Sequence, residues 1–342
     1  MIKKIISLVT VFSLILCIGC TAAEPKPVTP TTKNDVCTIG LSFDSFVIER
    51  WTRDRDIFVS TANELGAEVN VQSAVGDVET QISQIKYFMD IGVNAIVIVT
   101  ADSEALTPVL KEASGKGIPV ICYDRLVMNA NADLYISFDN RKVGEQMANA
   151  ICDNVPDGGT IVEICGPESD YNVAQVMSGF DSVCVDHGMV VKLKYNCVNW
   201  KPELAYDFVN DNFDDISSAD AIMCGNDALA GEAIHALAER GYAGKIFVTG
   251  QDGDLEACQR IVENTQLVTV YKPVEKLARL AAECAVKLAA GHPIQNYSKF
   301  FDGTQDIPYI AIEPSAVTRD NLDEVIIDSG FHLREEVYIN ES

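Results

Sequence analysis

The amino-acid sequence predicts an α/β protein made of two Rossmann-like lobes, each built on a parallel sheet. From residue 38 onward, short runs rich in β-branched residues alternate with amphipathic stretches of helical length. That alternation is typical of βαβ units. It continues through two successive blocks of about 110 to 130 residues, each the size of an ordinary domain. With 342 residues, 48% of them hydrophobic, the chain can bury both cores.

The first block begins with a strand and alternates regularly. Glycines follow its first two helices, where a left-handed residue usually ends a helix. Asp77 and Ser103 stand where capping side chains are expected. The predicted elements are strand 38–43, helix 47–65, strand 68–74, helix 78–91, strand 95–101, helix 103–116, strand 118–124 and strand 134–139.

The second block continues this alternation, with a turn at 156–159 between its first helix and its first strand. Its predicted elements are helix 142–154, strand 160–166, helix 173–186, strand 189–196, helix 203–213, strand 221–225, helix 228–240, strand 245–250, helix 255–263 and strand 267–272.

The remaining helix, 274–290, and the tail are too short for a third domain, so we expect them to pack on the first two lobes. The predicted first lobe comprises 36–138 and 273–302, and the second comprises 139–272 and 303–333. The chain would then cross between the lobes three times, which describes a hinge rather than a free linker.

The first twenty residues carry an export signal. Lys3 and Lys4 precede a short apolar run that ends at Gly19-Cys20, as in a secretory signal peptide. The Gly-Cys junction resembles a bacterial lipobox, which implies lipidation of Cys20 and anchoring at the outer face of the cell membrane. Cleavage after Ala23 and a protein without an anchor is the alternative. Residues 21–35 read as a flexible tether.

Composition excludes several classes of function. A net charge of −24 argues against a nucleic-acid partner, because such binding requires cations that neutralise phosphates. Phosphate-loop, dinucleotide and zinc-protease motifs are missing, and the four histidines are scattered, so neither a cofactor nor a metal is expected. Most of the eleven cysteines are expected to be free core thiols, with one bridge, involving Cys184 and Cys197, left open.

Seven apolar runs stop at or shortly before clusters of hydrogen-bonding or aromatic residues. Carboxyl ends of parallel strands converge on one crevice, so these groups can meet at one ligand. Polar groups together with indole faces suit a sugar. The clusters are Glu49-Arg50-Trp51, Tyr123-Asp124-Arg125, Phe138-Asp139-Asn140, Asn199-Trp200, Gly225-Asn226-Asp227, Gly250-Gln251-Asp252 and Tyr271-Lys272-Pro273.

Asp124 and Arg125 form the sharpest pair, because a carboxylate and a planar guanidinium can fix the orientation of a sugar ring. A structural ion pair between them is the alternative. For Arg50 the alternative is a surface salt bridge with Glu49, and for Trp51 it is core packing.

Several further candidates have structural alternatives. Asp139 and Asn140 stand at the junction of the halves, where they could also cap a helix. Asn226 is preferred over Asp227 as the ligand residue, because Asp227 is a natural helix cap. Trp200 follows a strand and could stack on a sugar or anchor its loop. Asp252 and Lys272 complete the set, since a lysine ending a buried strand needs solvent, a carboxylate or a ligand.

The ordered fragments resemble periplasmic sugar-binding proteins of the ribose/galactose type, and among them the D-xylose-binding members that serve ABC importers. The similarity covers residues 36–332. The fragments are ERWTRDRDIFV (49–59), TQISQI (80–85), YDR (123–125), YISFDNRKVGE (135–145), GNDALAGEAIHAL (225–237), GQDGDL (250–255) and TVYKPVEKLA (269–278).

The resemblance implies a clam-shell fold that binds a monosaccharide, most closely D-xylose, and passes it to a membrane permease as a monomer, without catalysis. It implies ligand roles for Arg50, Trp51, Asp124, Arg125, Asp139, Asn140, Trp200, Asn226, Asp252 and Lys272. The loops 42–48, 126–131 and 166–173 depart from the xylose pattern, which leaves glucose, galactose or ribose open.

Other functions remain as alternatives. The protein could present a sugar to a membrane kinase or chemoreceptor, which a pull-down of membrane partners would show. Repressors of the lactose type share the fold, but they carry a DNA-binding segment where this chain has its signal sequence. A glycosidase using Asp124, Asp139 or Asp252 would turn over xylosides.

Overall fold

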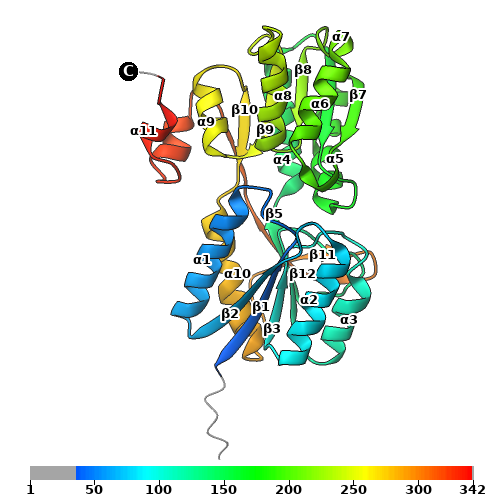
Figure 1. The fold of residues 1–342 in the computed structure, drawn as a ribbon, viewed down its shortest axis with the longest axis vertical. Helices are drawn as coiled ribbons and strands as arrows, with labels where there is room; N and C mark the ends of the chain where they lie inside the picture. The colour runs from blue at the N-terminus through cyan, green and yellow to red at the C-terminus, as the bar shows by residue number, and fades with distance from the viewer. Residues whose placement is uncertain (1–35, 341–342) are drawn as a thin grey trace, which may run out of the picture. The chain divides into compact units, whose positions relative to one another are not determined.

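A computed structural model describes residues 36–340, which form two sheets flanked by helices (Figure 1). The predicted signal peptide, Cys20 and the tether lie outside the described residues. The two α/β lobes predicted from the sequence are confirmed.

The first sheet has seven strands, all parallel except β11, which is antiparallel to β12. In spatial order the strands are β11 (Ser298–Phe301), β12 (Asp306–Ile312), β5 (Leu134–Phe138), β4 (Val120–Tyr123), β3 (Ala95–Ile98), β1 (Cys37–Phe43) and β2 (Ala67–Ser73).

Four helices cover this sheet, with α1 and α10 on one side and α2 and α3 on the other (Figure 1). The central strands are buried on both faces, which explains their continuous apolar sequences. The helices are α1 (Arg50–Glu64), α2 (Val78–Ile91), α3 (Thr107–Gly115) and α10 (Val274–Ala289).

The second sheet has six strands, parallel except for β13 against β10. In spatial order they are β13 (Ser315–Val317), β10 (Val268–Tyr271), β9 (Phe247–Asp252), β8 (Ala221–Cys224), β6 (Thr160–Cys165) and β7 (Val190–Asn196). Its helices are α4 (Asn140–Asn154), α5 (Tyr171–Asp186), η1 (Val198–Trp200), α6 (Glu203–Asp211), α7 (Phe213–Ile216), α8 (Asp227–Glu239), α9 (Leu255–Val262), η2 (Asp323–Ile327) and α11 (Arg334–Val337).

Two glycines bring α4 and α5 together. A Cβ atom at Gly144 would lie 1.9 Å from the carbonyl oxygen of Val176, and one at Gly179 would lie 2.0 Å from that of Arg141. The absence of side chains at both positions therefore allows the helix backbones to touch.

The chain crosses between the sheets after β5, after β10 and after β12. The lobe bounds predicted from the sequence place these crossings after residues 138, 272 and 302. The third differs, because we expected residues 303–333 in the second lobe, whereas β12 pairs with β5 in the first sheet. The Tyr309 ring stacks on Tyr135 at 4.8 Å, and the chain returns to the second sheet only at β13.

The start of the third predicted helix also differs. Ser103 does not cap it; Asp102 instead accepts hydrogen bonds from the backbone nitrogens of Glu104 and Ala105 in a preceding turn. The helix itself begins at Thr107.

Candidate functional site

Strand ends from both sheets face one cavity at the boundary between the lobes. This is where a ligand is expected in an open α/β sheet. The cavity is lined by Ile48, Arg50, Trp51, Asp124, Arg125, Cys165, Gly166, Asp170, Asn172, Val173, Val176, Met177, Trp200, Met223, Gly225, Asn226, Gln251, Asp252 and Lys272.

Arg50 organises the wall contributed by the first lobe. Its guanidinium donates hydrogen bonds to both carboxylate oxygens of Asp54, at 3.1 and 3.2 Å, and to Asp124 Oδ2 at 2.9 Å. It also lies 4.3 Å from the centroid of the Trp51 ring. The charge is buried but paired in a fixed fork, so its position is well defined.

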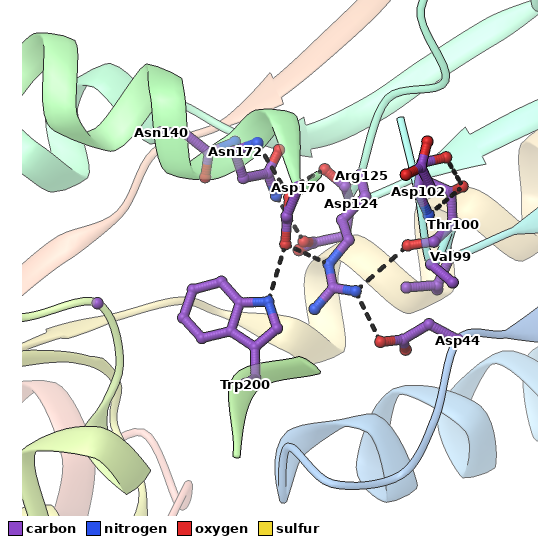
Figure 2. A network of polar contacts seen from close by, with 12 residues as sticks. Asp44, Val99, Thr100, Asp102, Asp124, Arg125, Asn140, Asp170, Asn172 and Trp200 are labelled. Carbon is purple, nitrogen blue, oxygen red and sulfur yellow. Dashed lines mark hydrogen bonds and ion pairs between the residues drawn. The ribbon is translucent and has the colours of Figure 1, made fainter. Parts of the chain in front are cut away.

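Arg125 joins the two lobes (Figure 2). Its Nη1 donates to Asp44 Oδ2 at 2.7 Å and to the carbonyl oxygen of Thr100 at 3.2 Å, both in the first lobe. Its Nε lies 2.7 Å from Oδ2 of Asp170, which precedes α5 in the second lobe. The same Asp170 oxygen accepts a hydrogen bond from Trp200 Nε1 at 3.1 Å.

A second contact also spans the lobes. Asn172 Nδ2, at the start of α5, donates to Asp124 Oδ1 at 3.0 Å. Together with the Arg125–Asp170 ion pair, this contact links the two lobes beside the cavity. Asp124 and Arg125 also have partners within the first lobe, Arg50 and Asp44, so each takes part in contacts within and between the lobes.

The residue that caps α8 differs from the one expected from the sequence, which was Asp227. Asn226, not Asp227, caps the helix, because its Oδ1 accepts from the backbone nitrogen of Leu229 at 2.9 Å. Asp227 begins the helix and accepts from Thr269 Oγ1 at 2.6 Å and from the backbone nitrogen of Gly253 at 2.9 Å. Asn226 still lines the cavity, as predicted for a ligand residue.

Asp252 and Lys272 complete the wall of the second lobe. Lys272 Nζ lies 3.3 Å from Asp252 Oδ1, which is also 3.9 Å from Arg50 Nη1 across the lobe boundary. Gln251 donates from Nε2 to the carbonyl oxygen of Gly225, which fixes its side chain at the cavity edge. Carboxylate, ammonium and amide groups therefore share this wall.

Three cavity residues have left-handed backbone conformations. The φ angles are 62° at Asp124, 107° at Asp252 and 56° at Trp200. Such conformations cost about 1 to 3 kcal/mol each for residues other than glycine, and they cluster at functional sites. The fold therefore holds these side chains in place at the expense of stability.

Five buried atoms of cavity residues have no hydrogen-bond partner among residues 36–340. They are Trp51 Nε1, Arg125 Nη2, Asn226 Nδ2, Gln251 Oε1 and Asp252 Oδ1. Buried donors and acceptors are costly to leave unpaired. A small molecule carrying several hydroxyl groups, each both donor and acceptor, would satisfy them.

The charged network shifts the pKa values of its members. Burial raises the pKa of Asp170, against the opposing effect of Arg125. Burial acts in the same sense on Asp124, but Arg50, Lys272 and Arg125 outweigh it, and the pKa of Asp124 is lowered. Asp124 therefore keeps its charge more firmly than Asp170, which suits an acceptor of hydroxyl protons.

Eight of the ten predicted ligand residues line the cavity, and Asp139 and Asn140 do not. Asp139 caps α4 by accepting from the backbone nitrogen of Lys142 at 3.1 Å. Asn140 Nδ2 donates to Gln175 Oε1 at 2.9 Å, and both predicted residues line a separate cleft. The chain crosses to the second lobe directly after β5, so these two residues begin a helix instead of facing the cavity.

Sequence reasoning missed Asp170, Asn172 and Gln251. Asp170 caps α5 and Asn172 lies in its first turn, several residues beyond β6 and not at a strand end. Their only sequence signal was an acidic residue shortly before a predicted helix. Gln251 stood in a recognised cluster, but the charged neighbour Asp252 was chosen instead.

Three features are not found among the described residues 36–340: a disulfide, a cluster of metal-binding side chains and a membrane-spanning helix. The nine cysteines between residues 36 and 340 are all free thiols, so no Cys184–Cys197 bridge forms. Over the same range, histidine, cysteine and acidic side chains form no group of three able to hold a metal ion. Nor does that range contain a helix long and apolar enough to cross a membrane.

Comparison with known proteins gives a matching family model and relatives of similar length. Residues 39–293 match the model of the periplasmic binding protein domain. A D-xylose-binding periplasmic protein of Haemophilus influenzae is 40% identical over 305 residues, which cover 88% of this chain and 92% of the relative. One from Escherichia coli is 40% identical over 304 residues, covering 87% of this chain and 92% of the relative.

Solved structures agree with this fold. An ABC transporter solute binding protein from Clostridium phytofermentans, with bound β-D-glucose, has a TM-score of 0.80 and 28% identity. The match covers 88% of this chain and 99% of that one. A carbohydrate transporter solute binding protein from Chloroflexus aurantiacus shares the fold, with a TM-score of 0.79 and 24% identity over 87% of this chain and 97% of that one.

Proposed function

This chain belongs to the periplasmic binding protein family, and from that premise we propose that it captures D-xylose between its lobes for import by an ABC transporter. The observation that carries the proposal is the cavity at the lobe boundary, where five buried polar atoms lack hydrogen-bond partners among the described residues. A pentose supplies hydroxyl groups for those atoms. The sugar specificity is supported by the two D-xylose-binding relatives at 40% identity.

Binding would work by differential contact. Arg50, Asp124 and Arg125 reach the sugar from the first lobe, while Asn226 and Asp252 reach it from the second. A ligand that touches both walls only in the closed form shifts the equilibrium toward closure. No bond is made or broken, and the closed shape is what a permease would recognise.

The remaining ligand residues have related roles. Trp51 and Trp200 present indole faces to the C–H groups of the ring. Lys272, Asp170, Asn172 and Gln251 add hydrogen-bonding groups around it. We propose that all of these contact the sugar.

We propose that the protein acts outside the cytoplasm as a monomer, held at the membrane by a lipid on Cys20. The signal-like first twenty residues support this location. Metabolic labelling with a fatty-acid analogue tests the anchor, since Cys20→Ser should abolish labelling. Labelling that persists in the variant would contradict it.

Tryptophan fluorescence tests the sugar directly, because Trp51 and Trp200, the two tryptophans of the chain, both line the cavity. D-Xylose should give a saturable change at lower concentration than D-glucose, D-galactose or D-ribose. A response to another sugar but none to D-xylose would refute the assigned specificity. Turnover of a xyloside would indicate a glycosidase instead.

A further inference from the structure

Three sulfur atoms converge on one wall of the cavity. Cys165 Sγ lies 3.2 Å from Met177 Sδ and 3.9 Å from Met223 Sδ. The three residues come from β6, α5 and β8, so separate elements bring both methionine sulfurs to Cys165. Sulfur forms only weak hydrogen bonds, so hydrogen bonding among these three side chains contributes little to stability.

The strand register explains why two of them face the same way. Met223 is the neighbour of Glu163 across the β6–β8 pair, and Cys165 follows Glu163 by two residues on the same face of the sheet. Met177 then covers that face from α5. The arrangement is therefore built into the sheet and does not depend on a mobile loop.

A thiolate with two thioethers is a soft donor set, and such a set suits a soft metal ion such as Cu(I). Sulfur atoms placed about 2.3 Å from a metal in a flat triangle lie roughly 4 Å apart. The 3.9 Å separation already matches this, and the 3.2 Å separation requires only a small outward shift of Met177. Methionine, with three rotatable bonds, adapts easily to such a shift.

An entry path lies on the other side of the same wall. A second cleft is lined by Cys165 and Met177 together with Glu163, Glu168 and Lys194. Lys194 pairs with Glu163 at 2.7 Å, which leaves the Glu168 carboxylate to favour a cation at this opening. An ion could therefore reach two of the three sulfurs without passing through the sugar cavity.

We propose that Cys165, Met177 and Met223 form a binding site for a soft monovalent metal ion of the Cu(I) class. The metal–sulfur bond at Cys165 replaces its S–H bond, one proton leaves to solvent, and the thioethers donate electron pairs without losing a bond. No electron is transferred. Because the same side chains line the sugar cavity, an ion that shifts them should weaken sugar binding, and sugar should weaken metal binding by the same factor.

The test is an anaerobic titration of the reduced, full-length protein with Cu(I), buffered by a chelator of known affinity. The wild type should bind one equivalent at least 100-fold more tightly than Cys165→Ser. Met177→Leu and Met223→Leu keep side-chain volume, so they should fold normally and bind at least tenfold more weakly. Cys37→Ser removes a partly exposed thiol elsewhere and should leave Cu(I) binding unchanged.

Fluorescence locates the ion independently. The Trp200 indole lies against Gly166, the residue next to Cys165, so bound Cu(I) should quench it. Equal affinity in wild type and Cys165→Ser would overturn the proposal. Equal affinity in both leucine variants would also overturn it, by assigning the ion to a lone thiol. Unchanged D-xylose affinity with one equivalent of Cu(I) would contradict its place in the cavity wall.

Discussion

Replacing Asp170 by asparagine should weaken D-xylose binding strongly. Asp170 Oδ2 lies 2.7 Å from Arg125 Nε and accepts a hydrogen bond from Trp200 at 3.1 Å. Asp170→Asn keeps the shape of the side chain but removes its charge. The Arg125 contact joins one lobe to the other, so its loss acts on the closed form, where the sugar is held.

The size of the effect follows from the geometry. Two unit charges 2.7 Å apart attract by about 6 kcal/mol at an effective dielectric constant of about 20, before the cost of dehydrating both. Removing one partner of a buried charge pair at an interface typically costs about 2 to 5 kcal/mol. Arg125 retains Asp44, so we expect the lower half of that range, about 2 to 3 kcal/mol, or a 30- to 150-fold weaker affinity.

Titration calorimetry with D-xylose measures this change. The matched control is Asp139→Asn, the same substitution at a predicted ligand residue that lies outside the cavity. Asparagine caps a helix as well as aspartate does, so stability and affinity should both persist in the control. A loss below threefold at Asp170, or an equal loss at Asp139, would refute the assignment of these two carboxylates.

Two further predictions concern stability. Burial raises the pKa of Glu163 to about 7 from 4.5, so the folded protein keeps a proton that the unfolded chain has lost. The free energy of unfolding should therefore fall by up to about 3 kcal/mol as pH rises through this window, and Glu163→Gln should remove that decline in urea unfolding at pH 5 and 8; an unchanged decline would contradict it. Gly144→Ala should lower the free energy of unfolding by about 1 to 3 kcal/mol or more, because its Cβ would overlap the backbone of Val176. Gly115→Ala, with open space around it, should stabilise by up to about 1 kcal/mol in thermal unfolding, and equal shifts for both would count against the α4–α5 packing described.

Local pattern was sufficient to predict most of the fold. Each predicted strand and helix corresponds to an element of the structure, because alternation of β-branched runs and amphipathic stretches reflects burial directly. The sheet that β12 joins was not predictable in this way. That choice depends on packing of Tyr309 against Tyr135, residues 174 positions apart, which no local pattern encodes.

The site was predicted where strand ends and cavity coincide. Asp124 directly follows β4 and Asp252 ends β9, and both line the cavity. Asp139 also follows a strand, but its chain turns at once into a helix of the other lobe. Asp170 was missed because a loop, whose path is set by tertiary packing, carries it back to Arg125.

The most direct test of the central claim is a calorimetric titration of the wild-type protein with D-xylose and, in parallel, D-glucose. We predict one D-xylose per chain, bound more tightly than D-glucose, as expected for one cavity between two lobes. No heat of binding with D-xylose, or tighter binding of D-glucose, would contradict the proposal that this cavity selects a pentose.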